Sequence, residues 1–412
     1  MNAICLILDR LHVGYLGPLG NTWIDTPAFN RLAAEGFVFD QAWVDSPVLD
    51  ALCQGLWLGL HPRQRDIGGQ SVITALAAAG LHPALITDEP LVARHPLADA
   101  FAMRWELEEP AAVAAARQME DTHLARCFAR LLECLEHLRG PFVVWCHLRA
   151  LGAPWDAPVS LREAYRQEGD PMPLVTTEIP SQTLPPDFDP DELLAITHAY
   201  AGQVTLLDQC LGGLLEWLNS GAGRETLLIV LSARGMPLGE HLRVGPGRDT
   251  LHAEVTHVPL LLRLPGAVEA AGRTNAIVHP ADLAGTLLDF CGVKDSSVPP
   301  TSRSLLPLVR GEVETIRDRH LIVADSGQEG LADPAGAASA ERALVTPAWY
   351  YHWAERPELY VLPDDFWQAS DVADRCPEIV DLLEQALRQY EEALASGKAA
   401  MPPLAPALLE PP

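Results

Sequence analysis

Short apolar runs recur along the chain and alternate with longer segments of helical periodicity. Residues 3–8, 142–148 and 227–231 are apolar almost throughout and end at polar residues. Such continuous runs are typical of strands that are covered on both faces of a sheet. Residues 37–44 and 82–87 predict two further strands by composition and length.

Helices are predicted between these strands by their period and their end residues. In "TPAFNRLAAEG", Thr26 is a candidate N-cap, Pro27 suits the first helical position and Gly36 ends the helix. Further helices are predicted at residues 71–80, 122–138 and 192–218. Strands that alternate with helices favour a parallel sheet with helices on both faces.

Two regions depart from this alternation. Residues 152–190 are rich in proline and lack periodicity, which predicts a long surface loop. Near residue 320 the apolar runs become short and predict antiparallel strands, followed by a helix and a proline-rich extended or disordered end. We therefore expect an α/β domain at 1–318, a C-terminal α+β subdomain at 319–400 and a tail at 401–412.

Charge narrows the range of partners. The 412 residues include 55 acidic and 29 basic side chains, a formal net charge of −26. Such a surface repels nucleic-acid phosphates and anionic lipids, so we expect neither as a partner. No apolar run approaches the length of a spanning helix and no signal peptide is recognised, which predicts a cytoplasmic protein. The oligomeric state stays open.

The cysteines and histidines give little sign of a metal site. Eight cysteines are scattered without CxxC spacing, which disfavours a disulfide framework. No histidine pair shows HxxxH or HExxH spacing, which disfavours zinc.

Several segments, in order, resemble one family. They are "TPAFNRLAAEG", "LSARGMPLGEH", "EVTHVPLLLRLPG", "HPADLAGTLLDFCGV" and "PELYVLPDD". Together they resemble the sulfatases of the alkaline-phosphatase superfamily over nearly the whole chain. The resemblance implies a large mixed α/β sandwich, followed by a small unit with an antiparallel sheet and a helix.

The resemblance also implies hydrolysis of sulfate esters with calcium and a formylglycine made from cysteine. The expected site contains two aspartates after the first strand, but only Asp9 is kept and Arg10 follows it. Leu49 stands where the cysteine is expected and has no nucleophilic atom. Two further metal ligands are replaced by Ala233 and Arg234. An arginine does not deprotonate to become a ligand.

Three further positions depart from the pattern of the family. Cys53 aligns with an expected arginine, Asp88 with a catalytic lysine and Gly152 with a histidine. We therefore expect neither calcium nor formylglycine. Our hypothesis is that Arg10 or Arg234 replaces the ion as the counter-charge to Asp9.

Other side chains near the expected site allow two interpretations. Asp50 and Cys53 could be replacement nucleophiles, or a helix-start residue and a packed thiol. His147, at a strand end, is the best histidine candidate for chemistry, the alternative being a hydrogen-bonded core histidine. An anion pocket or separate salt bridges could be formed by Arg10, Arg149, Arg234 and Arg243. A sugar cleft or ordinary packing could involve Trp43, Trp57, Trp145 and Trp155.

The function suggested by the sequence is a sulfatase-like protein that has lost catalysis and binds a small anionic or sulfated ligand or a glycan, or acts as a scaffold. One alternative is an active, metal-dependent sulfate or phosphate ester hydrolase rebuilt around Asp9, Asp50 and His147. Another is a structural partner without a ligand pocket. The loss of several site residues together favours the first interpretation, because the chemistry depends on those residues. The family fold by itself does not establish an activity.

Overall fold

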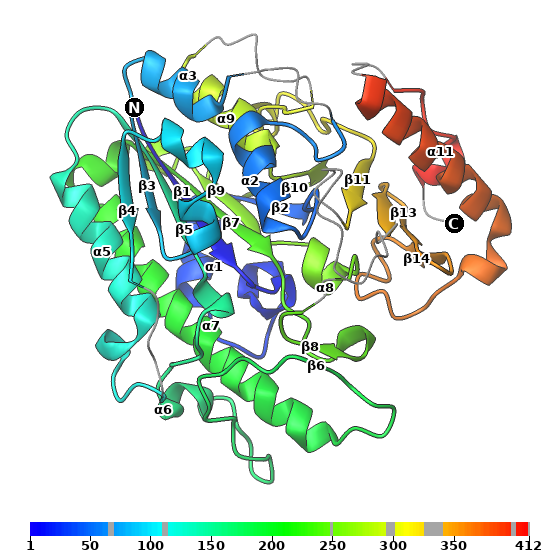
Figure 1. Ribbon diagram of the computed structural model, residues 1–412, viewed down its shortest axis with the longest axis horizontal. Helices are drawn as coiled ribbons and strands as arrows, with labels where there is room; N and C mark the ends of the chain where they lie inside the picture. Colours follow the sequence, from blue (N-terminus) through cyan, green and yellow to red (C-terminus); the bar gives the residue numbers. More distant parts are fainter. Residues whose placement is uncertain are drawn as a thin grey trace.

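An eight-stranded sheet with helices on both faces forms the centre of the molecule (Figure 1). The computed structural model describes residues 1–64, 70–108, 114–247, 250–293, 301–324, 341–396 and 401–410. The strand order is β10-β2-β9-β7-β1-β5-β3-β4. The sheet is mixed, because β9 runs antiparallel to both β2 and β7 while the other pairs are parallel.

The strands and helices of this domain have the following bounds. The strands of the sheet are β1 (Asn2–Asp9), β2 (Phe37–Ala42), β3 (His82–Thr87), β4 (Met103–Glu106), β5 (Phe142–Leu148), β7 (Thr226–Arg234), β9 (Leu260–Arg263) and β10 (Gly272–Val278). The helices are α1 (Pro27–Glu35), α2 (Leu49–Leu58), α3 (Val72–Ala78), α4 (Pro90–Ala93), α5 (His123–His137), α6 (Val159–Arg162), α7 (Pro190–Leu218), α8 (Ala253–Thr256), α9 (Asp282–Phe290) and α10 (Leu306–Val309). A separate ribbon pairs β6 (Gln182–Thr183) with β8 (Arg243–Val244).

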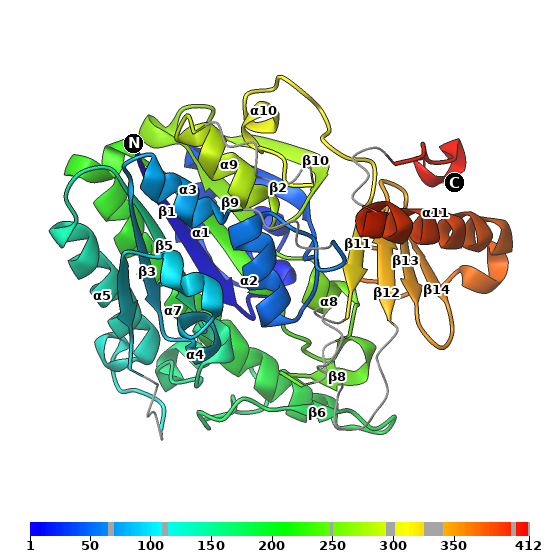
Figure 2. The same cartoon turned by 45° about the horizontal axis from the view of Figure 1, so that its top comes forward.

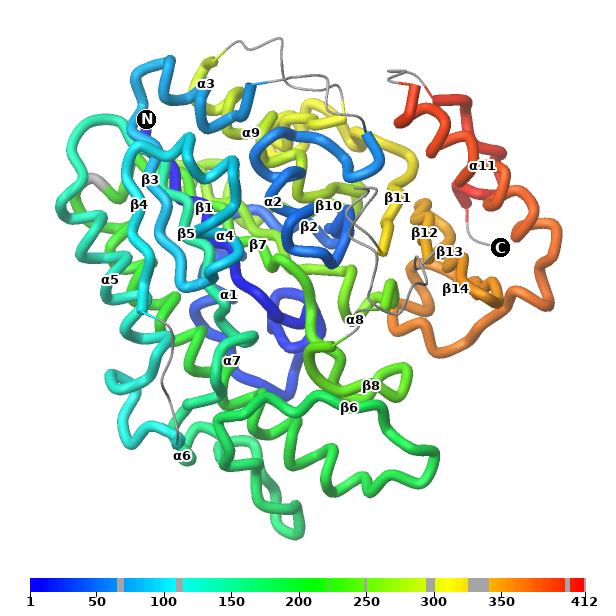
Figure 3. The backbone as a smooth tube through the Cα atoms, viewed as in Figure 1, coloured from blue at the N-terminus to red at the C-terminus, as the bar shows by residue number. Residues whose placement is uncertain are grey.

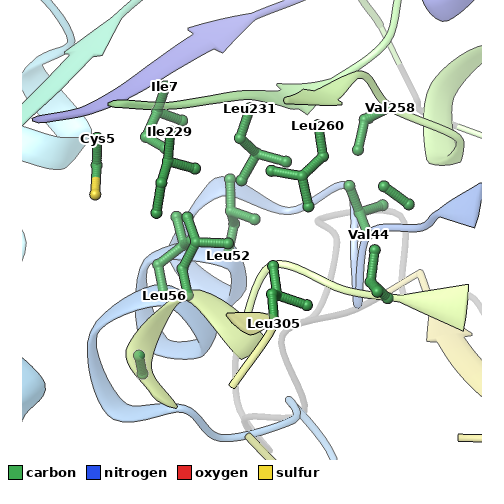
Figure 4. Packing of buried hydrophobic residues seen from close by; sticks show 14 of the residues in the cluster. Cys5, Ile7, Val44, Leu52, Leu56, Ile229, Leu231, Val258, Leu260 and Leu305 are labelled. Atoms are coloured by element: carbon green, nitrogen blue, oxygen red, sulfur yellow. The ribbon is translucent and has the colours of Figure 1, made fainter. Parts of the chain in front are cut away.

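The central strand β1 supplies side chains to two cores, because successive residues of a strand point to opposite faces. Cys5 and Ile7 belong to the core under α2, α3 and α9, where they lie near Leu52 and Leu56 (Figure 4). Leu6 and its alternate neighbours belong to the core under α1, α5 and α7. Burial on both faces explains why β1 reads as a continuous apolar run.

A second, four-stranded antiparallel sheet lies beside the large domain (Figure 2). Its strands, in spatial order, are β11 (His320–Val323), β12 (Arg342–Val345), β13 (Trp349–Trp353) and β14 (Glu358–Val361). Helix α11 (Pro377–Ser396) packs on it through Leu383, Leu387 and Leu394, which share a buried cluster with residues of the sheet. The domain boundaries at residues 318 and 400 stay predictions.

Of the expected extended or disordered end, residues 401–405 have no regular secondary structure, whereas the following residues form a short helix. Pro406–Leu408 forms a 3-10 helix, and Leu408 is only 1% exposed. The indole Nε1 of Trp349 donates to the carbonyl oxygen of Ala407 at 2.9 Å. Leu408, an apolar side chain within the proline-rich end, therefore packs in the buried cluster between the small sheet and α11. Residues 411–412 lie outside the described residues.

One local prediction differs from the structure, and one short strand was missed. Thr26 occupies the N-cap position of α1, but its hydroxyl accepts from the backbone N–H of Gly17 at 2.9 Å and caps no helical N–H. The short edge strand β4 was not predicted, because its side chains alternate between half-buried and exposed.

The chain between β5 and α7 lies at the periphery (Figure 3) and contains α6 and β6. Within the described residues, we find no helix of the length and apolarity needed to cross a membrane.

Candidate functional site

Asp9 and Arg234 meet at the ends of two adjacent parallel strands. They are partners in the register of β1 and β7, next to an irregularity between Leu8 and Asp9. Nε of Arg234 donates to Oδ1 of Asp9 at 3.0 Å, and Nη2 donates to Oδ2 at 3.2 Å. Nη1 of the same guanidinium donates to the carbonyl oxygen of Pro47 at 3.0 Å. One arginine thus ties the first strand to the segment before α2.

The ion pair keeps Asp9 charged despite its burial. Asp9 is only 6% exposed. Burial alone would raise the pKa of Asp9, but the charges of Arg234 and Arg10, together with the hydrogen bond from Arg234, hold it below the usual carboxyl value. The hypothesis that a guanidinium lies where a metal counter-charge was expected therefore agrees with this geometry, with Arg234 as the direct partner.

Arg10 has a different position. Its backbone is left-handed, with a φ of 65°, which is uncommon for a residue with a side chain. Nη1 of Arg10 donates to the carbonyl oxygen of Gly235 at 3.3 Å, and its own carbonyl accepts from the hydroxyl of Tyr200 at 2.7 Å. Arg10 is buried, and its charge still acts on Asp9. It joins the first strand to the turn after β7.

These residues do not fit the calcium ion that the resemblance implies. Calcium prefers six to eight oxygen ligands. Of the four expected ligand positions, only Asp9 carries a carboxylate, and both of its oxygens accept hydrogen bonds from Arg234. Ala233 offers no ligand atom, and two guanidinium groups would repel a divalent ion.

The expected nucleophile position lies at the start of α2 and carries no reactive atom. Leu49 begins the helix and is 6% exposed. Asp50, in the first turn, accepts from Nε2 of Gln54 at 3.0 Å and lies 3.3 Å from Nε2 of His95. Cys53 is buried, and this burial, followed by the charges of Asp50 and Glu89, raises the pKa of its thiol. Asp50 is therefore a first-turn residue and Cys53 a packed thiol.

A small cavity lies between α2 and the segment around α4. It holds about 250 Å³. Leu49, Asp50 and Cys53 line one side of it, while Arg94 and His95 line the other. The walls combine apolar carbon with the cation of Arg94, the ring of His95 and the carboxylate of Asp50, a composition that suits a small polar ligand. This cavity therefore lies beside the expected nucleophile position.

His147 is buried at the end of β5 without a hydrogen-bond partner for either ring nitrogen among the described residues. This differs from the hydrogen-bonded core histidine considered from sequence. Burial lowers the pKa of His147 to about 4, although the charges of Asp9 and Asp88 act in the opposite direction. The ring is therefore neutral near pH 7 and lies within electrostatic reach of both carboxylates.

The positions expected to hold a lysine and a histidine have other roles. Oδ1 of Asp88 accepts from the backbone N–H of Arg149 at 2.7 Å, and Oδ2 lies 2.7 Å from Nε2 of His123. At Gly152, a Cβ would lie 3.1 Å from Cγ of Arg10 and 3.2 Å from Oδ2 of Asp9. Gly152 thus lies beside Asp9, where the stem of Arg10 and the carboxylate of Asp9 leave little space for a side chain.

The contacts of the candidate arginines differ from one arginine to the next. Arg234 binds Asp9, whereas Nε of Arg149 lies 3.7 Å from the carboxylate of Glu89. Arg243 lies in the β6–β8 ribbon and donates to Oγ1 of Thr183 at 3.0 Å. Of the two interpretations of the tryptophans, ordinary packing agrees with the structure, because all four are fully buried, namely Trp43, Trp57, Trp145 and Trp155.

Sequence reasoning missed two features around the site. The backbone carbonyl of Pro47 cannot be recognised from residue type, and only the fold shows that it accepts a hydrogen bond from Arg234. His123 and Cys127 are four residues apart on a predicted helix, a spacing that places both on one face. That spacing was a usable signal that neither the histidine pairs nor the CxxC pattern contains.

Solved structures similar to this chain cover almost all of it. The phosphonate monoester hydrolase of Agrobacterium radiobacter matches with a TM-score of 0.72 at 19% identity, covering 97% of this chain and 95% of that chain. A structure solved with its substrate D-glucosamine-2-N,6-O-disulfate matches with a TM-score of 0.75 at 16% identity, covering 97% and 99%. The fold is therefore that of the sulfatases and alkaline phosphatases.

The sequence comparisons lead to the family. The model described as Sulfatase matches residues 1–293, and the chain belongs to this family. The N-acetylglucosamine-6-O-sulfatase of Bacteroides thetaiotaomicron is 26% identical over 205 residues, covering 47% of this chain and 36% of the relative. The multifunctional alkaline phosphatase superfamily protein PehA of Trinickia caryophylli is 29% identical over 124 residues, covering 30% and 24%. The matches thus span only about a third and a quarter of these relatives.

Proposed function

We propose that this member of the sulfatase family has lost ester hydrolysis and binds a small sulfated ligand. The observation that carries the proposal is the pairing of Arg234 with both oxygens of Asp9, beside a leucine at the nucleophile position. A sulfate ester needs an attacking atom and a charge that stabilises the leaving oxygen. Leu49 supplies no attacking atom, and the residues around Asp9 do not fit the calcium ion.

The ligand class is inferred from the cavity beside Leu49 and from the relatives. Arg94 lines that cavity and can donate hydrogen bonds to sulfate oxygens, whereas Nδ1 of His95 accepts from the backbone N–H of Leu97 and its Nε2 faces Asp50. One similar structure contains D-glucosamine-2-N,6-O-disulfate, and one relative is named N-acetylglucosamine-6-O-sulfatase. Because the net charge is −26, a local cation is needed for an anion to approach this surface. We therefore propose a sulfated amino sugar as the ligand.

Hydrolysis and binding are tested separately on the purified chain. We expect no turnover of nitrophenyl sulfate or nitrophenyl phosphate above the buffer rate, with or without added calcium. We expect calorimetric titration to detect binding of D-glucosamine-2-N,6-O-disulfate. Arg94→Ala should weaken that binding by about tenfold, the effect of one lost charged hydrogen bond. Arg310→Ala is the matched control, because Arg310 is exposed and pairs with Glu312 at 3.8 Å.

A second candidate is an active, metal-dependent ester hydrolase with a rebuilt site. The observation that favours it is His147, whose two ring nitrogens have no hydrogen-bond partner among the residues that the structure describes, while the charges of Asp9 and Asp88 act on it. A neutral buried imidazole in such a place can serve as a general base. Turnover that requires a metal ion and is lost in His147→Asn would favour this candidate and contradict the proposed loss of hydrolysis.

A further inference from the structure

Three side chains of different chemistry converge beside the carboxyl end of β3. Asp88 follows β3, and His123 and Cys127 lie one helical turn apart at the start of α5. Nε2 of His123 lies 2.7 Å from Oδ2 of Asp88 and 3.4 Å from Sγ of Cys127. The remaining distance, from Sγ of Cys127 to Oδ2 of Asp88, is 4.0 Å. A carboxylate oxygen, an imidazole nitrogen and a sulfur thus face one point.

The groups are held in place by the backbone around them. Oδ1 of Asp88 accepts from the backbone N–H of Arg149 at 2.7 Å, which leaves Oδ2 directed at His123. The backbone N–H of His123 donates to Oδ2 of Asp156 at 2.7 Å. The hydroxyl of Thr122 caps α5 by accepting from the N–H of Ala125 at 3.2 Å. Such supporting contacts are what orients ligands in metal sites.

The distances suit a tetrahedral ion. Ligands about 2.0 to 2.3 Å from zinc are separated from one another by roughly 3.3 to 3.7 Å. The separations here, 2.7, 3.4 and 4.0 Å, lie on both sides of that range, so the ion requires changes in the ligand separations of about 0.6 Å or somewhat more. Asp88 and Cys127 are buried, while the side chain of His123 is 13% exposed and leaves a route for entry.

The donor set also selects the metal. Thiolate, imidazole and carboxylate together favour zinc over calcium or magnesium, which prefer oxygen alone. The carboxylate of Asp156, which also acts on Cys127, adds negative charge near the cluster. The four-residue spacing on α5 places His123 and Cys127 on one face, and Oδ2 of Asp88, 2.7 Å from Nε2 and 4.0 Å from Sγ, completes the cluster.

We propose that Asp88, His123 and Cys127 form a zinc-binding site with three protein ligands and an open fourth position. On binding, the S–H bond of Cys127 breaks, the sulfur keeps the electron pair and forms the bond to zinc, and the proton passes to solvent. No oxidation or reduction takes place. The site is separate from the Asp9–Arg234 pair, so the zinc proposal can be tested independently of the proposed loss of hydrolysis.

Cobalt titration of the full chain, stripped with a chelator, tests this site. We expect one Co²⁺ to bind per chain with a thiolate-to-cobalt absorption band in the near ultraviolet, and Zn²⁺ to displace it. One proton should be released per ion at neutral pH. Cys127→Ser should remove the band and weaken zinc binding by at least about tenfold. Asp88→Asn, which keeps the shape of the side chain, should weaken binding while retaining the band.

The matched control is Cys134→Ser, a buried cysteine two turns further along α5, which should leave the band and the zinc affinity unchanged. Circular dichroism shows whether each variant folds, and Asp88→Asn provides the test if Cys127→Ser does not fold. A band that persists in Cys127→Ser overturns the proposal. So does cobalt bound without a thiolate band, which would place the ion at a cluster of histidines and carboxylates such as Asp45, His279 and His320.

Discussion

Arg234 introduces a permanent charge at a strand end where the family resemblance leads us to expect a metal ligand. Its three contacts, two to Asp9 and one to Pro47, use all three guanidinium nitrogens. A fixed planar fork matches a carboxylate in a way that lysine does not. The side chain therefore has a structural role that a spherical ion would otherwise have, namely to compensate a buried carboxylate and join neighbouring segments.

We predict that Arg234→Ala destabilises the fold by about 2–4 kcal/mol, because it leaves Asp9 buried without its partner. The folded-state pKa of Asp9 is lowered, so the contribution of the pair is present above the usual carboxyl pKa of about 4 and is lost as pH falls through the folded-state value. The destabilisation should therefore be largest near neutral pH and decrease in acid. Urea unfolding across this pH range measures it.

Two variants control this prediction. Asp9→Asn combined with Arg234→Met removes both charges, so it should recover part of the stability lost in Arg234→Ala. Arg243→Ala, in the β6–β8 ribbon, should change stability by less than about 1 kcal/mol. Equal destabilisation by Arg234→Ala at neutral and acid pH would show that the charge on Asp9 is not the cause.

In the small sheet, contacts between neighbouring strands make the stability of the fold depend on pH. On β13, Nδ1 of His352 lies 3.3 Å from Oε2 of Glu358 on β14, and Nε2 lies 3.7 Å from Oε2 of Glu341. Burial would lower the pKa of His352, but the two carboxylates outweigh it and raise the value to about 8. The protonated ring thus helps to hold β13 against its neighbours.

We predict that stability from His352 is fully present below its usual pKa of about 6.5 and is lost as pH rises through about 8. The loss should reach about 1–2 kcal/mol. Chemical denaturation between about pH 6 and pH 9 measures it. His352→Gln should remove this part of the slope, whereas His137→Gln, at an exposed position, should not. An unchanged slope in His352→Gln would contradict the assignment.

The C-terminal segment is held to the same small core by one apolar side chain. Leu408 is 1% exposed, whereas Leu409 is 37% exposed. We predict that Leu408→Ala destabilises the protein by about 2–3 kcal/mol and that Leu409→Ala changes stability by less than about 0.5 kcal/mol. Thermal and urea unfolding of the two variants compare adjacent leucines that differ mainly in burial. Equal effects would show that the segment does not pack in solution.

The charge of the whole molecule predicts its response to salt. With 55 acidic and 29 basic residues, the folded chain repels itself. Salt near physiological strength screens charges more than about 8 Å apart. We predict that the thermal midpoint rises when sodium chloride increases from about 10 mM to about 150 mM, where the screening length falls from about 30 Å to 8 Å. A neutral osmolyte of equal osmolarity is the control, and a falling midpoint would show that screened ion pairs outweigh the repulsion.

Much of the architecture could be predicted because it depends on neighbouring residues. The apolar runs and their end residues predicted β1, β5 and β7, and the family resemblance predicted a mixed sheet with a small antiparallel unit. Periodicity records whether one or both faces of an element are buried, and this information is local. The meeting of Asp9 and Arg234 was also predictable, since adjacent parallel strands bring their carboxyl ends to one edge.

Such patterns do not predict the direction in which a side chain points or the atoms that it contacts. The left-handed backbone of Arg10 and its contact with Gly235 depend on segments far apart in the chain, as does the convergence of Asp88 with Cys127. Register, turn geometry and packing set these contacts together. A sequence pattern can thus specify which residues reach a strand end, but the complete fold is needed to determine which atoms touch there.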